Sequence, residues 1–309
     1  MLAVFLQSVP FFALIGLGYL AGRSGAFPEE ATGYLTKFVF YFALSALLFG
    51  FAANLSLSDI LVPTYLAAYL CACFVVWALV AVVAILRRRP MAEAVVEAQC
   101  GVIGNTGFLG VPMLVILLGE AAVGPVLMAL AADLVVFSSL FTILITISRE
   151  GTVSLALARG VVMGVLRNPM VMSMALGLVW AALDLPLPRP AGDFLTILGA
   201  AATPCALFAI GASLAGKSAE RVEVAVWLSF AKLVLHPAAA AVSALLIFRL
   251  DPFSAMVMIS AAALPVAGNI FILARQYGTA PQRVSAAILI SHVAGVVTIP
   301  FVIAWAMGT

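Results

Sequence analysis

Charge is scarce in this chain of 309 residues, because only 9% of them are Asp, Glu, Lys or Arg and only 2 are histidine. Soluble domains carry about 25% charged residues and are roughly half apolar. Here 65% of the residues are hydrophobic, so too few polar side chains remain to cover a soluble fold. The net charge of +2 gives no reason to expect a nucleic-acid partner. The composition excludes a soluble enzyme and predicts an all-α polytopic membrane protein.

Metal and nucleotide motifs are also absent from the sequence. The four cysteines lie in apolar runs, without His or carboxylate ligands at the short spacing of a metal site. We therefore expect reduced packing cysteines, no metal and no other cofactor. The Gly-rich stretch 104–110 lacks the Lys-Ser/Thr ending of a P-loop, which excludes ATP-driven pumping by this chain alone.

Long apolar runs recur along the whole chain. Each is near the roughly 20 residues that a helix needs to cross the hydrocarbon core of a bilayer. Reading these runs between charges, prolines and glycine clusters predicts ten spans, at 2–22, 33–53, 61–86, 95–119, 121–148, 168–184, 191–215, 222–248, 252–277 and 283–307.

The basic residues between these spans are strongly biased to one side. The even-numbered loops contain only Arg189 and Arg249. The odd-numbered loops contain eleven basic residues, namely Arg23, Arg87, Arg88, Arg89, Arg149, Arg159, Arg167, Lys217, Arg221, Arg275 and Arg283. Cytoplasmic loops carry the excess of Lys and Arg, so we expect both termini on the outer, periplasmic side.

The two halves of the chain share a weak internal repeat with an offset of about 160 residues. The matching groups keep their order: Pro10 and Leu17-Gly18 with Pro169 and Leu176-Gly177, Ala46-Leu47 with Ala206-Leu207, and Gly104-Asn105 with Gly268-Asn269. Five spans per half is an odd number, so repeats 1–150 and 151–309 must have opposite orientations in the membrane. Inverted repeats are common in secondary transporters, which bind substrate near the midplane at the repeat interface.

The predicted spans four and nine contain helix-breaking residues at corresponding positions. Four glycines within 101–110 would cost a helix roughly 4 kcal/mol relative to alanine. Free amides and dipoles at the starts of half-helices attract anions. We therefore predict broken helices whose substrate-binding residues are Gly104, Asn105, Thr106, Gly107, Pro265, Gly268 and Asn269. The alternative is that these glycines and prolines only allow close helix packing.

Few ionisable side chains lie inside the predicted spans. At 1.5 Å per residue, Asp133, Lys232 and His292 lie about 14–18 Å deep, with His236 one turn beyond Lys232. Intramembrane charges are costly and indicate functional sites, so these four residues are candidates for ion coupling or charge tuning. Asp133 and Lys232 could instead form a structural ion pair, and both histidines could be hydrogen-bonded core residues. We expect Glu97, near the cytoplasmic mouth, to be solvated.

Several of these segments resemble the auxin efflux carrier family. The similarity extends over essentially the whole chain, and its most specific parts are Asn105-Thr106 followed by Gly110-Val-Pro112, Lys232-x4-Pro237, and Ala263-Leu264-Pro265 followed by Ala274-Arg275-Gln276-Tyr277. The resemblance implies ten helices in two inverted repeats, with helices 4 and 9 broken and crossing at the site. It further implies a scaffold of spans 1, 2, 6 and 7 that dimerises, and a transport domain of spans 3–5 and 8–10 that moves like an elevator.

The family resemblance also implies the substrate class, which is organic anions such as auxin or malonate. The short loops suit a bacterial member in the inner membrane, surrounded by lipid. Gly104 and Ile270 replace the prolines that plant members carry at each crossing, and the role of Asn269 depends on the repeat alone. Without a sodium-site signature like that of the related bile acid symporters, uniport, H⁺ coupling and Na⁺ coupling all stay open.

The predicted function is thus a secondary carrier of small organic carboxylates. Two other classes of function fit single features of the sequence. The segment Gly211-Ala-Ser213-Leu-Ala215 is close to the G-x-S-x-G nucleophile elbow and would suit an intramembrane hydrolase, although its last residue is not Gly. A receptor or channel could use the same cavity, but the loops are too short to contain a signalling domain.

Overall fold

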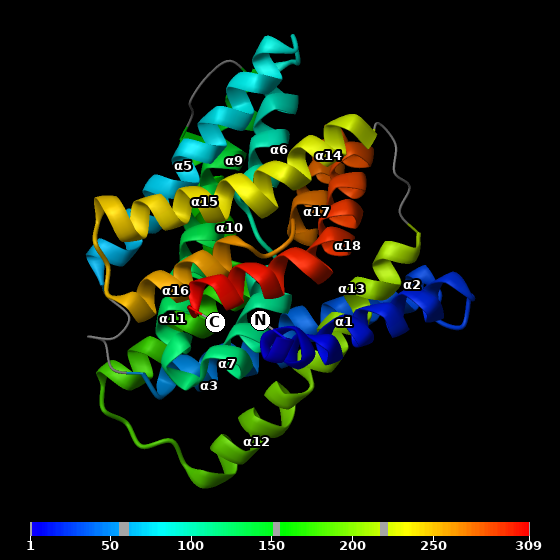
Figure 1. Ribbon diagram of the computed structural model, residues 1–309. Coiled ribbons are helices and arrows are strands. Elements are labelled where there is room, and N and C mark those ends of the chain that lie inside the picture. Colours follow the sequence, from blue (N-terminus) through cyan, green and yellow to red (C-terminus); the bar gives the residue numbers. More distant parts are fainter. Residues whose placement is uncertain (1, 56–61, 151–154, 217–221, 309) are drawn as a thin grey trace.

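The computed structural model describes residues 2–55, 62–150, 155–216 and 222–308 (Figure 1). Within these ranges the chain forms helices joined by turns, with one isolated antiparallel bridge between Gly104 and Val266. Lys217 and Arg221 lie outside the described residues. The expected repeat boundary after residue 150 falls at the edge of another segment that is not described. The prediction of an all-helical polytopic membrane protein is confirmed at this level.

The described part of the first half of the chain contains helices α1 to α3 and α5 to α9, several of them interrupted by a π-helical or 3₁₀ turn, labelled η. Their bounds are α1 Leu2–Arg23, α2 Glu29–Phe38, η1 Val39–Ala43, α3 Leu44–Ala53, α5 Pro63–Leu86, α6 Met91–Val102, η2 Thr106–Gly110, α7 Val111–Leu118, η3 Glu120–Ala122, α8 Val123–Ala131, η4 Ala132–Phe137 and α9 Ser138–Glu150.

The second half contains helices α10 to α18, again with π-helical turns. Their bounds are α10 Leu155–Leu166, α11 Pro169–Ala182, α12 Arg189–Ala200, α13 Ala202–Ala215, α14 Val222–Phe230, η5 Ala231–Leu235, α15 His236–Ala241, η6 Val242–Ile247, α16 Pro252–Ala262, α17 Gly268–Gln276 and α18 Pro281–Ala306.

Seven helical stretches in the described parts of the chain are long and apolar enough to cross a membrane. An eighth results if α10 and α11, which meet at 65°, are counted as one span. The bend follows from Asn168, whose side chain accepts hydrogen bonds from the amides of Met170 and Val171, and from Pro169 in the first turn of α11. The spans predicted at 95–119 and 252–277 are each divided into shorter helices.

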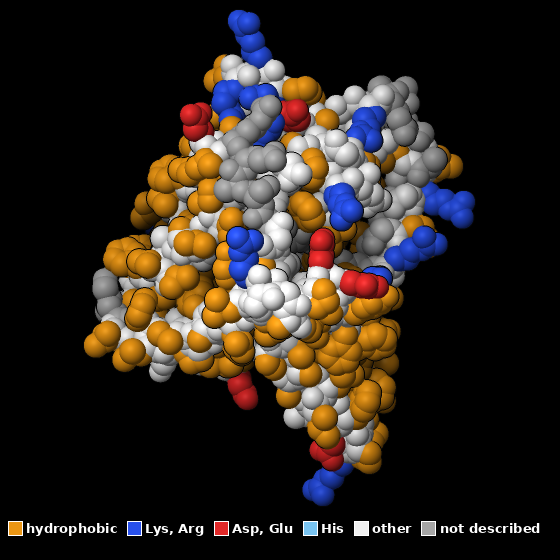
Figure 2. All heavy atoms as spheres, turned by 90° about the vertical axis from the view of Figure 1, so that its right-hand side faces the viewer, with side chains coloured by type: hydrophobic (Ala, Val, Ile, Leu, Met, Phe, Trp, Pro, Cys, Tyr) orange, Lys and Arg blue, Asp and Glu red, His pale blue; other side chains and the backbone are white. Residues whose placement is uncertain are grey.

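The helices form two groups in Figure 1. One group contains α1, α2, α3, α11, α12 and α13, with α1 packed along α13 and α3 packed against α11 and α12. The other contains α5, α6 and α14 to α18, in which α5 packs on α6 and α15, and α18 on α14 and α16. Large apolar side chains face outward over much of the surface, including Leu155 at 87% and Ile197 at 76% exposure. Figure 2 shows hydrophobic side chains across one face of the molecule.

Glycines bring the helices of the first group into close contact. A Cβ at Gly18 in α1 would lie 2.1 Å from the Phe208 carbonyl oxygen of α13, and one at Gly211 would lie 1.9 Å from the carbonyl oxygen of Ile15. Similarly, a Cβ at Gly177 in α11 would lie 2.7 Å from the Phe49 carbonyl oxygen of α3. Small residues of this kind let membrane helix backbones approach each other closely.

Substitution of Gly18 by Ala should therefore destabilise the protein by about 1–3 kcal/mol, because the opposing atom is backbone and cannot move away. Gly16→Ala is the matched control, since a Cβ there meets no atom within 4 Å. Thermal unfolding in detergent measures both. Equal melting temperatures for the two variants would contradict the close contact of α1 with α13.

Candidate functional site

The two interrupted helices meet at their breaks. After α6 ends at Val102 the chain is non-helical over 103–105, and after α16 ends at Ala262 it is non-helical over 263–267. The Asn105 amide donates to the Pro265 carbonyl at 2.8 Å, and the Ala267 amide donates to the Ile103 carbonyl at 3.1 Å. The crossing is thus a short antiparallel backbone pair, and it contains three of the predicted site residues, Gly104, Asn105 and Pro265.

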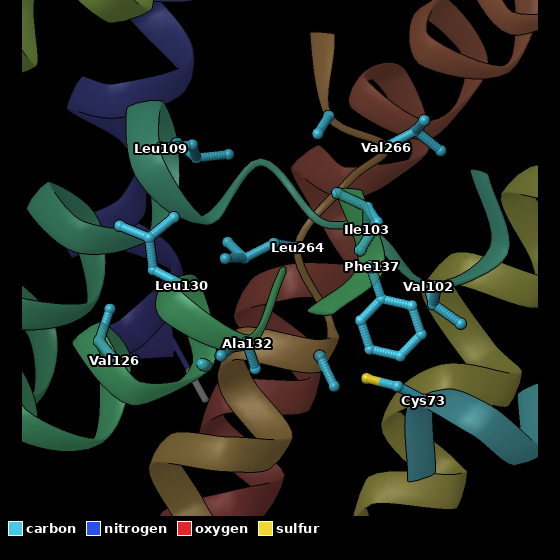
Figure 3. Close-up of a cluster of buried hydrophobic side chains, with 14 of the residues drawn as sticks. Cys73, Val102, Ile103, Leu109, Val126, Leu130, Ala132, Phe137, Leu264 and Val266 are labelled. Atoms are coloured by element: carbon cyan, nitrogen blue, oxygen red, sulfur yellow. The ribbon is translucent and has the colours of Figure 1, made fainter. Parts of the chain in front are cut away.

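Buried apolar side chains make up part of the surroundings of this crossing. Figure 3 shows Ile103 and Val266, one from each non-helical segment, among Leu264, Leu109, Phe137 and other buried residues. Backbone polar groups in such an interior need partners, because water is not there to supply them. Pro265 has no amide hydrogen, and the Val266 amide donates to the Ser291 hydroxyl at 3.1 Å, so each remaining amide of 265–267 is satisfied.

Asn105 and Thr106 are both buried at the start of the second half of the broken helix. The Asn105 side-chain nitrogen lies 3.4 Å from His292 Nε2. The backbone carbonyl of Asn105 accepts from the backbone amides of Leu109 and Gly110. The Thr106 hydroxyl donates to the Asp133 carboxylate at 3.3 Å. The first amides of a helix have no intrahelical acceptor, so those following Asn105 point their hydrogens toward the crossing.

The hydrogen bonds of His292 determine its tautomer. Its Nδ1 lies 2.8 Å from the Ile288 carbonyl, which can only accept, so Nδ1 carries the proton. In the neutral ring, Nε2 is then the acceptor for the Asn105 amide group. The expectation that His292 is a hydrogen-bonded core residue is met, and the same contact places it against the candidate substrate-binding Asn105.

Asp133 lies in the π-helical turn η4 and is 3% exposed. One of its carboxylate oxygens accepts from the Tyr69 hydroxyl at 2.9 Å, and the other from Thr106. π-Helical turns inside α-helices are frequent at functional sites. The last residue of this turn, Phe137, accepts from the Gln99 side chain through its backbone carbonyl at 3.0 Å.

Lys232 lies in another π-helical turn, η5, and is fully buried. Its Nζ is 2.6 Å from the Ala262 carbonyl and 3.0 Å from His236 Nδ1. Because Nζ donates to Nδ1, the proton of a neutral His236 ring is on Nε2, which lies 3.1 Å from the Cys73 sulfur. His236 is therefore also hydrogen-bonded in the core, as one of the two interpretations predicts.

Asp133 and Lys232 do not form a direct ion pair. The ion pairs between described residues all involve Arg87, Arg283, Glu93 and Glu97. Both groups nevertheless lie beside the same segment of the crossing, since Asp133 accepts from Thr106 and Lys232 Nζ lies next to Gly104. The structural ion-pair interpretation is thus wrong in its direct form, because each group is held by separate hydrogen bonds.

The remaining predicted site residues lie around the same crossing. A Cβ at Gly104 would be 3.3 Å from Lys232 Nζ, and one at Gly107 would be 2.5 Å from the end of Met170 in α11. Gly268 begins α17 beside open space, since a Cβ there meets nothing within 4 Å. Next to it, the Asn269 side-chain oxygen is buried and has no hydrogen-bond partner among the described residues.

Sequence reasoning missed the contribution of α5 to the site. Tyr65, Tyr69 and Cys73 repeat every four residues along one buried face of an otherwise apolar helix, and this spacing was the available signal. Cys73 was assigned to packing alone, but it contacts His236. The Tyr65 hydroxyl is buried without a partner in the described structure.

The solvated position expected for Glu97 is wrong. Its side chain is 1% exposed and forms ion pairs with Arg87 and Arg283, and Arg283 also pairs with Glu93 at 2.9 Å. Two guanidinium groups stabilise the buried carboxylate, which would otherwise lose its hydration. Arg283, expected in a loop, is therefore a buried residue of α18 that joins this helix to α6.

The structure gives no support to a nucleophile elbow at Ser213. This residue lies inside the continuous helix α13 and not at a strand-to-helix turn. Its exposed hydroxyl donates to the Ile210 carbonyl at 2.8 Å, and both histidines are buried at the crossing.

The fold and the crossing define a multi-pass membrane protein with two broken helices joined at their breaks. A family model described as "Membrane transport protein" matches residues 3–303. A Rhizobium meliloti (strain 1021) protein named "Putative malonate transporter" is 32% identical over 298 residues, covering 94% of this chain and 92% of that protein. The chain belongs to the membrane transport protein family, and its resemblance to the auxin efflux carriers is confirmed.

The Tyr69–Asp133 hydrogen bond can be tested by Tyr69→Phe, which removes only the hydroxyl. Because a buried carboxylate then loses a donor, we expect destabilisation by about 1–3 kcal/mol in thermal unfolding. Tyr41→Phe is the matched control, since Tyr41 is 54% exposed and should tolerate the change. A Tyr69→Phe protein as stable as this control would mean that Asp133 does not depend on the bond.

Proposed function

We propose that the protein is a secondary carrier of small organic carboxylates, malonate-like acids included, and that the substrate binds where the two broken helices cross. The observation that carries this proposal is the backbone pairing of 103–105 with 265–267. Discontinuous helices that meet at the middle of a membrane are typical of transporter substrate sites. The name of the Rhizobium relative supports the carboxylate assignment.

Two helix N-termini converge at this crossing. The segment η2–α7 begins at Thr106 and α17 begins at Gly268, directly after the paired residues on each chain segment. Neither start is capped by a side chain of its own N-cap residue. The free amides and the positive ends of both helix dipoles therefore favour an anion.

The side chains at these two N-termini suit a carboxylate ligand. On one side, Asn105 and Thr106 lie at the start of η2, with the backbone of Gly104 and Gly107 adjacent. On the other, Pro265 pairs with Asn105, and Asn269, whose buried side-chain oxygen has no partner among the described residues, follows Gly268 at the start of α17. Asp133, Lys232, His236 and His292 surround the site and adjust its charge.

We further propose ten membrane segments in two inverted repeats, the broken helices being the fourth and ninth. In this repeat α1 corresponds to α11, and α3 corresponds to α13. The contact of α1 with α13 is therefore the counterpart of the contact of α11 with α3, and both contacts are present. Gly18 and Gly177, equivalent in the proposed repeat, lie at these two contacts. The group containing α1, α3, α11 and α13 would be the dimerising scaffold, and the other helices would move against it like an elevator in the inner membrane.

Asn105→Ala tests the site. A ligand that binds only the native state stabilises it by about 2.7 kcal/mol at a hundred times its dissociation constant. We expect malonate to raise the melting temperature of the wild-type protein, and Asn105→Ala to weaken malonate binding at least about tenfold, since it removes a ligand at the crossing. Uptake of radiolabelled malonate into proteoliposomes should fall in parallel.

Asn54→Ala is the control for that experiment, because Asn54 is exposed and bonds only within its own helix end. It should bind malonate as the wild type does. If carboxylates leave the melting temperature unchanged while uncharged or cationic solutes raise it, the carboxylate assignment is wrong. If Asn105→Ala binds malonate normally, the site lies elsewhere.

A further inference from the structure

The ammonium group of Lys232 lies at the broken end of a helix. Its side chain is fully buried, and Nζ lies 2.6 Å from the carbonyl oxygen of Ala262, the last residue of α16. In a continuous helix this carbonyl would accept from the amide four residues later, which is that of Val266. The Val266 amide instead donates to Ser291, so the ammonium group of Lys232 replaces the missing backbone donor.

The position of the ammonium group is favourable electrostatically. The carbonyl end of a helix carries partial negative charge, and a cation there is stabilising. A Cβ on Gly104 would lie 3.3 Å from Nζ, so the group lies directly beside the backbone of the crossing. The other titratable neighbours are His236, in hydrogen-bond contact, Asp133, whose charge acts on Lys232 from η4, and Cys73 of α5.

In carriers with discontinuous helices, half-helix C-terminal ends and unwound carbonyls commonly coordinate the coupling Na⁺. We propose that the Lys232 ammonium group takes the place of such a metal cation, so that carboxylate binding in this protein needs no sodium. This inference rests on the proposed function, and it goes further by assigning the charge at the crossing to the chain itself. Three N–H donors on a flexible stem allow Lys232 to contact Ala262 and His236 together.

The wild-type protein gives the first test. Malonate-dependent thermal stabilisation is measured in sodium chloride and in choline chloride at equal ionic strength. We expect the malonate dissociation constants to agree within about twofold, because the ammonium group is present in both salts. If the wild-type protein bound malonate about tenfold or more tightly in sodium chloride than in choline chloride, the proposal would be overturned.

Variants of Lys232 give the second test. Lys232→Ala removes the charge and leaves space beside the Ala262 carbonyl and Asp133, so malonate affinity should fall at least about tenfold in choline chloride. Sodium or methylammonium chloride should restore most of it. Lys232→Met loses the charge but fills the space, so it should lose affinity without rescue. Lys37→Ala is the matched control, because Lys37 is exposed in α2.

The outcomes separate this inference from the proposed function. Normal malonate binding by Lys232→Ala in choline chloride, or a loss that no cation restores, would overturn the role of Lys232 while leaving the carboxylate site intact. If malonate does not affect even the wild type, the proposed function fails. The melting temperature of Lys232→Ala in methylammonium against choline chloride, without malonate, still tests the cation position. The wild-type arm decides the question if the variants do not fold.

Discussion

The fold depends on one constraint, which is that two unwound backbone segments cross in an apolar interior and must satisfy each other's hydrogen bonds. Each segment provides both a donor and an acceptor: Asn105 and Ile103 on one side, Ala267 and Pro265 on the other. Neither break could exist alone in lipid, since unpaired amides and carbonyls there cost several kcal/mol each. The pairing therefore explains why glycine and proline interrupt both helices, and why the two interruptions lie together.

The charged side chains follow from the same constraint. Breaking α16 leaves the Ala262 carbonyl without its helical donor, and Lys232 supplies one. A buried ammonium needs compensation, and its direct contacts are the Ala262 carbonyl and His236, while the Asp133 carboxylate is held separately by Tyr69 and Thr106. Both residues lie in π-helical turns, η5 and η4, which shift the side chains that follow relative to a regular helix. The polar groups are thus held by several helices at once, and the crossing is their common centre.

Much of this could be predicted from the sequence, because the signals are local. Composition predicted the membrane class, the clusters 101–112 and 264–268 predicted breaks where the structure has them, and depth counting brought Asp133, Lys232, His236 and His292 to one level. Three-dimensional pairing could not be predicted in the same way. The short distance of Glu97 from a loop predicts a solvated side chain, and only the folded arrangement places Arg87 and Arg283 against it. The bend at Asn168 depends on a cap hydrogen bond that span counting ignores.

The proposed repeat makes the backbone of the two halves equivalent, but the side chains are not. In the proposed repeat, the span that contains Asp133 corresponds to α18, which contains His292, and α5, which contains Cys73, corresponds to the span that contains Lys232. In the structure, Thr106 bonds to Asp133 while the adjacent Asn105 contacts His292, and Cys73 lies next to the histidine that holds Lys232. A symmetric crossing with two identical charges would either repel an anion or attract it equally from both halves. Here one carboxylate and one ammonium lie at non-equivalent positions, so the charge around the crossing differs between the two halves. In the proposed site, Lys232 neutralises the C-terminus of α16, whereas His292 contacts Asn105 on the other segment, so the two halves of the site differ in their side chains even where their backbones match.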